Sequence, residues 1–108
     1  MTELTNLGVK AIRDGVASGD FTAREVAESF NAAVAAAAEL NAFIVTTPDH
    51  ALAAADATDA ARASGQELGA MAGVPIGMKD LFATKHTQTT AASHILEGFK
   101  PEYESTVS

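Results

Sequence analysis

The first half of the chain carries apolar residues at the spacing of amphipathic helices. Val9, Ile12 and Val16 recur three and four residues apart, which predicts a short first helix. Asn6 is its expected N-terminal cap, and the Gly-Asp pair at 19–20 is expected to end it. The pattern therefore predicts one short helix followed by a turn.

Thr22 begins a second helix in the pattern of a capping box, with Glu25 three residues later. In such a box the threonine oxygen accepts a hydrogen bond from the backbone N–H of Glu25, and the Glu25 carboxylate accepts one from the amide of Thr22. Val26, Phe30 and Val34 then lie four residues apart on one face. These residues predict a helix that packs against another element.

Residues 41–47 have a different character, because positions 43–45 are Phe, Ile and Val. Aromatic and β-branched residues favour a short strand here. Thr47 and Pro48 then predict a third helix, with the threonine as cap and the proline at the first helical position. Gly65 is the expected end of that helix.

The third helix carries a charged face made of Asp49, Asp56, Asp59 and Arg62. We expect these acids to be solvated. Further along, residues 73–80 are expected to be a strand or an extended segment, and residues 93–98 are expected to form a helical turn. A helical first half followed by short strands indicates the α/β class. The 108 residues have the length of one domain and show no internal repeat, so residues 1–108 are interpreted as a single unit.

Composition narrows the classes of function. Acidic residues outnumber basic ones by 14 to 7, and the formal net charge is −7. Nucleic acid and anionic membranes are bound through clustered lysine and arginine, so this segment is not expected to bind either of them. The chain has no cysteine, and its three histidines lack metal-ligand spacing, so no metal or cofactor site is expected. Without a signal-peptide pattern or a membrane-spanning apolar run, a cytoplasmic protein is expected.

Lys79 is the candidate catalytic residue. It ends an apolar stretch, because residues 73–80 read Gly-Val-Pro-Ile-Gly-Met-Lys-Asp. Burial disfavours a charged ammonium, so a lysine held there can become neutral and act as a base. The ordinary alternative is a lysine that extends its ammonium group into water. The neighbours favour a base, since Pro75 fixes one dihedral, Gly77 permits close backbone approach and Asp80 can anchor the turn.

A base needs a group to act on. The hydroxyls nearest in sequence are Thr84, Thr87, Thr89, Thr90 and Ser93. Strand pairing and helix capping explain residues 89–90 and Ser93 as well as catalysis does. The chain has no glycine-flanked serine elbow and no phosphate-binding glycine loop. His86 and His94 have no acid or third ligand at matching spacing, so both are left out of the site.

Residues 73–80 resemble, without a gap, the segment that carries the catalytic lysine of the amidase signature family. The similarity extends through residues 19–26, 40–44 and 70–73. Within the family, residues 85–107 look most like the A subunits of glutamyl-tRNA(Gln) amidotransferases. The shared features there are a threonine pair at 89–90, Ser93 before Ile-Leu-Glu, Pro101, Tyr103 and a Thr-Val pair.

The resemblance implies the N-terminal portion of a mixed sheet flanked by helices. Two positions depart from the family pattern, because Leu81 stands where asparagine is usual and His86 where glycine is frequent. The family's glycine- and serine-rich segment, which supplies a bridging serine and an acylated serine, follows later in the polypeptide. The chain is therefore expected to be an incomplete amidase domain that carries only Lys79 of the catalytic triad and is inactive alone.

The resemblance also implies a mechanism and partners. Lys79 would be the terminal proton acceptor of a Ser, cis-Ser, Lys relay that attacks the glutamine side-chain amide and releases ammonia. A B subunit would use that ammonia, with ATP and magnesium, to convert Glu-tRNA(Gln) to Gln-tRNA(Gln). A small C subunit would complete the heterotrimer, and the tRNA would be contacted by the complex and not by this segment.

Two alternatives remain open from the sequence. A small-amide amidase of the same family would share the lysine motif and need neither tRNA nor partners. A non-enzymatic helical interaction module would present its alanine-rich helices to a partner, and Lys79 would then be an ordinary surface lysine.

Overall fold

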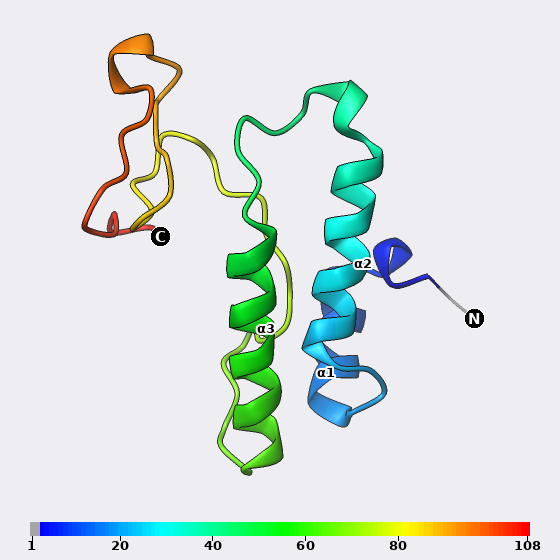
Figure 1. Cartoon of the computed structure of the whole chain (residues 1–108). Coiled ribbons are helices and arrows are strands. Elements are labelled where there is room, and N and C mark those ends of the chain that lie inside the picture. The colour runs from blue at the N-terminus through cyan, green and yellow to red at the C-terminus, as the bar shows by residue number, and fades with distance from the viewer. Residues whose placement is uncertain (1–2) are drawn as a thin grey trace. The chain divides into compact units, whose positions relative to one another are not determined.

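The computed structural model describes residues 3–108, which form two compact units. The first unit contains residues up to 42 together with 48–75, and the second contains 43–47 and 76–108. The long helices belong to the first unit, whereas the second consists mainly of turns and irregular backbone (Figure 1). Among residues 3–108, no helix is both long and apolar enough to cross a lipid bilayer.

The first predicted helix is present as α1, Val9–Ser18, and it ends before Gly19 as expected. The predicted cap at Asn6 is wrong. Asn6 is instead the last residue of a short 3₁₀ helix, η1, Leu4–Asn6. Because this turn uses the backbone up to residue 6 for its own bonding, the cap of α1 is Gly8, which has no side chain to contribute.

The second helix, α2, spans Ala23–Ala36 and begins where the capping pattern predicts. The Glu25 backbone N–H donates to the Thr22 hydroxyl oxygen at 3.0 Å. This is one half of the predicted capping box. A short 3₁₀ helix, η2, Ala38–Leu40, follows α2.

The third helix, α3, spans Pro48–Ala63, so Pro48 is its first residue as predicted. Its C-terminus is closed by two backbone hydrogen bonds, from Gly65 to the Arg62 carbonyl at 3.1 Å and from Gln66 to the Ala61 carbonyl at 3.0 Å. Gly65 has a φ of 81°, a left-handed conformation that glycine adopts without strain. The predicted stop at this glycine is confirmed.

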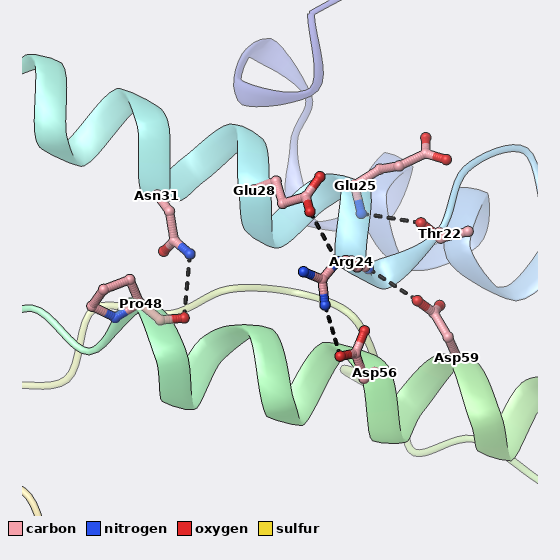
Figure 2. Close-up of polar contacts among 8 residues, drawn as sticks. All are labelled: Thr22, Arg24, Glu25, Glu28, Asn31, Pro48, Asp56 and Asp59. Carbon is pink, nitrogen blue, oxygen red and sulfur yellow. Dashed lines mark hydrogen bonds and ion pairs between the residues drawn. The ribbon is translucent and has the colours of Figure 1, made fainter.

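Side by side, α2 and α3 are joined by polar contacts at the start of α2 (Figure 2). The Asp59 carboxylate accepts from the Ala23 N–H at 2.8 Å and from the Arg24 N–H at 3.1 Å. The Arg24 guanidinium donates to Asp56 at 2.8 Å, and this bond raises the pKa of Arg24. The first amides of a helix lack intrahelical partners and attract negative charge. The expectation that these acids are merely solvated is therefore wrong for Asp56 and Asp59.

A small apolar core lies among the three helices. Its buried members are Ile12, Val16, Ala23, Val26, Ala27 and Ala55. Val74, from the segment before Lys79, packs against this core. The preceding Gly73 has a φ of 84°, and a Cβ there would lie 2.8 Å from Val16 Cγ2. Only glycine fits this approach, so helix packing and the start of the lysine segment depend on each other.

The predicted strand at 41–47 is not formed, and residues 74–79 have no regular secondary structure. Within residues 3–108, the β-type pairing found is one isolated bridge between Thr84 and Thr87. A strand requires a neighbouring backbone to complete its hydrogen bonds, and neither segment has one here. Ile44 is 67% exposed and Ile76 is 69% exposed. The expected mixed sheet is thus not confirmed, and the regular structure of the described residues is helical.

The helical turn expected within 93–98 is confirmed as the 3₁₀ helix η3, His94–Leu96. The Ser93 hydroxyl caps it by accepting from the Ile95 backbone N–H at 3.2 Å. Capping therefore accounts for Ser93, one of the hydroxyls near Lys79 in the sequence.

Candidate active site

Lys79 lies in the second unit, at the end of a segment without regular secondary structure and directly before a tight turn. Its carbonyl oxygen accepts from the Phe82 N–H at 3.1 Å, which closes a turn across Leu81. The turn forms although leucine occupies the position where the resembled family usually has asparagine. Lys79 is exposed, and no hydrogen bond or ion pair joins its ammonium group to another of residues 3–108. Its backbone is fixed while its amine is accessible.

Asp80, the next residue, is bound to the segment that begins at Thr90. Its carboxylate accepts from the Thr90 N–H at 2.9 Å and also from the Thr90 hydroxyl. Its carbonyl oxygen accepts from the Ala91 N–H at 2.9 Å. The expectation that Asp80 anchors the turn is therefore confirmed, through a partner ten residues away.

These contacts set the charge of Asp80. The hydrogen bond from the Thr90 hydroxyl, followed by that from the Thr90 N–H, lowers the pKa of Asp80, and it outweighs desolvation, which acts in the opposite direction. A carboxyl group whose pKa is lowered is ionised at neutral pH. Asp80 is thus a charged acceptor that makes charge-assisted hydrogen bonds, which are stronger than neutral ones.

The segment after Thr90 has an unusual backbone. Ala91 and Ala92 have φ angles of 49° and 63°, so two consecutive residues with side chains occupy the left-handed region. That conformation is unfavourable for an L-residue with a Cβ atom, by roughly 1–2 kcal/mol. The Ala92 N–H donates to the Thr90 hydroxyl at 3.2 Å, and Thr90 is only 7% exposed. Hydrogen bonds to Asp80 and Thr90 thus hold a strained turn.

Two other candidate hydroxyls, those of Thr84 and Thr89, hydrogen-bond to backbone carbonyls. Thr84 donates to the Phe82 carbonyl at 3.2 Å, and Thr89 donates to the Thr87 carbonyl at 3.1 Å. No hydroxyl in the part of the chain that the structure describes hydrogen-bonds to the Lys79 amine. The described residues therefore contain a candidate base without a paired nucleophile.

The contacts of the two histidines near this segment, His86 and His94, are with residues other than Lys79. The His86 N–H donates to the Pro101 carbonyl at 2.8 Å, and His86 has a φ of 64°. His94 is exposed, 3.9 Å from the Glu97 carboxylate. Across residues 3–108, no three His, Cys, Asp or Glu side chains are grouped as metal ligands would be.

Sequence reasoning missed the contact of Thr90 with Asp80, because strand pairing and capping already accounted for the pair 89–90. The structure shows Thr90 bound to Asp80, whereas Thr89 is not. No periodicity marks a contact between residues ten apart in irregular backbone. The available signal was chemical: an acid directly after the candidate lysine, with a hydroxyl pair following in the same segment.

The sequence matches the Amidase family over residues 25–108. It is 74% identical to the A subunit of the glutamyl-tRNA(Gln) amidotransferase of Novosphingobium aromaticivorans, over 100% of this chain and 22% of the relative. It is 58% identical to the protein of the same name from Zymomonas mobilis, with the same coverage. The chain thus spans about a fifth of the length of these relatives.

The fold also matches a solved structure, titled "An unexpected vestigial protein complex reveals the evolutionary origins of an s-triazine catabolic enzyme". The two chains are 36% identical, with a TM-score of 0.85 over 91% of this chain and 22% of the other. The sequence relatives and the solved structure are alike in that this chain covers 22% of each.

Proposed function

The chain belongs to the amidase family, and on that premise we propose that it is the N-terminal part of the A subunit of a glutamyl-tRNA(Gln) amidotransferase. The observation that carries this proposal is the 74% identity, over the whole chain, to a relative of that name. The solved structure named for an s-triazine catabolic enzyme is less similar, at 36% identity. The 74% identity to a relative named as an amidotransferase subunit favours the amidotransferase over a small-amide amidase.

We propose that Lys79 is the base of the glutaminase reaction. Its turn is held at the backbone and its amine is accessible, so a group from the remaining polypeptide can reach it. That polypeptide would cover Lys79 and exclude water, which favours the neutral amine over the ammonium. The amine would then accept a proton, relayed by a bridging serine, from the serine that attacks the glutamine carboxamide. The Lys79 ammonium would return this proton to the leaving nitrogen, so that ammonia departs and an acyl-enzyme remains, which water then hydrolyses.

The same proposal assigns partners. A B subunit would use the ammonia, with ATP and magnesium, to amidate Glu-tRNA(Gln), and a C subunit would complete a cytoplasmic heterotrimer. The net charge of −7 on this segment supports contacts to tRNA from other parts of the complex, because phosphates would be repelled here.

Replacing Lys79 in the full-length enzyme tests this function. Lys79→Ala should lower kcat for glutamine hydrolysis by roughly 10³-fold or more, while glutamine still binds, because a lost base removes transition-state stabilisation and leaves ground-state contacts. The measurements are ammonia release and glutamine binding by calorimetry. Lys100→Ala, which removes another exposed lysine of the second unit, is the matched control and should retain activity. Near-normal turnover in Lys79→Ala would remove the catalytic assignment.

A further inference from the structure

The residue that follows Lys79 is held more tightly than a surface turn requires. Asp80 receives hydrogen bonds from the Thr90 N–H and the Thr90 hydroxyl at its carboxylate, and from the Ala91 N–H at its carbonyl oxygen. We propose that this Asp80–Thr90 clamp positions Lys79 for proton transfer, so that Thr90 is a positioning residue of the reaction. The inference rests on the proposed function, in which Lys79 is the base.

The clamp can act on Lys79 because it holds the neighbouring residue at two points. One point is the Asp80 side chain and the other is its backbone carbonyl. Held at both groups, Asp80 cannot rotate about one of these hydrogen bonds without breaking the other. The Lys79 carbonyl is itself bound to the Phe82 N–H. Since a peptide unit is planar and rigid, these bonds fix the peptide unit that follows the Lys79 Cα, which restricts the direction in which the Lys79 side chain leaves the backbone.

Thr90 uses both capacities of its hydroxyl. It donates to the ionised Asp80 carboxylate and accepts from the Ala92 N–H at 3.2 Å. The side chain is nearly buried, at 7% exposure, so water competes little for these bonds. These bonds favour the charged carboxylate and so lower the pKa of Asp80.

Backbone strain supports a functional reading. Ala91 and Ala92 both have a left-handed backbone. A turn without a functional constraint is expected to adopt an unstrained conformation or to have glycine at such positions. Strain of this kind persists where surrounding contacts over-determine the backbone, and it concentrates at functional sites. Here the over-determining contacts are those to Asp80, the residue adjacent to the proposed base.

The test uses the full-length enzyme with its partner subunits and three variants. Thr90→Val removes the hydroxyl and keeps the shape, and Thr90→Ser restores the hydroxyl. Thr89→Val is the matched control, because Thr89 is adjacent, is also 7% exposed and bonds to the Thr87 carbonyl instead of Asp80. We expect Thr90→Val to lower kcat for glutamine by about 10- to 100-fold, the range for misplacing a catalytic group. KM should change by less than about twofold, since ground-state binding is retained.

Thr90→Ser should recover most of kcat, and Thr89→Val should stay within about twofold of the parent, as expected for a change that leaves the base in place. The clamp would be overturned by any of three results: equal losses of kcat in Thr90→Val and Thr89→Val, no recovery of kcat in Thr90→Ser, or a change in Thr90→Val that is confined to KM. If Thr90→Val does not fold, Asp80→Asn replaces it, with the same expected split between kcat and KM. If Lys79→Ala is inactive and Thr90→Val has normal activity, the clamp is refuted and the proposed function stands. If Lys79→Ala is active, the proposed function itself is refuted.

Discussion

At the scale of single residues, the backbone at His86 shows why glycine suits this position in the resembled family. His86 stands where the resembled family often has glycine, and its φ is 64°. It occupies the third position of a turn closed by the Thr87 N–H to the Thr84 carbonyl at 3.0 Å. A left-handed third position is the one that glycine favours in a type II turn. The histidine is accommodated there at the expense of stability.

Glycine at this position should therefore stabilise the protein. His86→Gly removes a left-handed strain of roughly 1–2 kcal/mol, and part of this gain is offset by roughly 0.4–1 kcal/mol of added unfolded-state entropy. The net expectation is a gain of about 0.5–1 kcal/mol, measured by urea unfolding. Lys85→Gly is the control, because Lys85 precedes His86 in the turn without a positive φ, and it should destabilise. Equal losses in both variants would show that His86 bears no strain.

At the scale of elements, charge on α3 completes the start of α2. Asp59 accepts from two backbone amides, 36 and 35 residues away in sequence, which the helix itself cannot satisfy. Arg24 adds a bridge to Asp56, with both side chains about half exposed, so this ion pair contributes less than the cap. Arg62, further along α3, donates to the Ala17 carbonyl at 3.2 Å. The charged face of α3 thus fixes how the helices of the first unit pack.

Removal of the Asp59 carboxylate should loosen the beginning of α2. Loss of a cap costs roughly 0.5–2 kcal/mol, which predicts about 2- to 30-fold faster hydrogen exchange at the Ala23 and Arg24 amides in Asp59→Ala. The measurement is amide exchange by NMR. Glu67→Ala, at an exposed acid outside the helices, should leave both rates unchanged. Unaltered exchange at both amides in Asp59→Ala would mean that α2 needs no cap from α3.

At the scale of the whole molecule, the chain spans 22% of the length of the relatives named above. Its second unit leaves several large apolar side chains exposed. Phe43, Ile44 and Met78 are 51%, 67% and 41% exposed, and they lie in the segments that were expected to be strands or extended. Exposed apolar residues in extended backbone are suited to pairing with further strands. That residues 1–108 form a single unit stays a prediction.

The 108-residue chain alone should not hydrolyse glutamine. Catalysis needs a nucleophile within hydrogen-bond reach of the base, and the described residues place none beside Lys79. Ammonia release from the purified chain should equal the buffer background, whereas the full-length complex under the same conditions should turn over. Turnover that persists through purification would reveal a nucleophile within these residues.

The sequence by itself determined the features that depend on neighbours a few residues apart. Thr22 capping α2, Pro48 opening α3 and Gly65 ending it are local hydrogen bonds and dihedral preferences, so they can be predicted without the fold. The lysine motif was likewise readable, because it is contiguous from 73 to 80.

Only the tertiary structure decided which distant groups meet. The bonds from Ala23 to Asp59 and from Thr90 to Asp80 join residues 36 and 10 positions apart, and no spacing rule anticipates them. The strand at 41–47 failed for the complementary reason, since its residues favour extended backbone but a strand exists only when a second backbone lies beside it. Local preference sets the conformation a segment favours, and long-range contact decides whether that conformation is paired and what it positions.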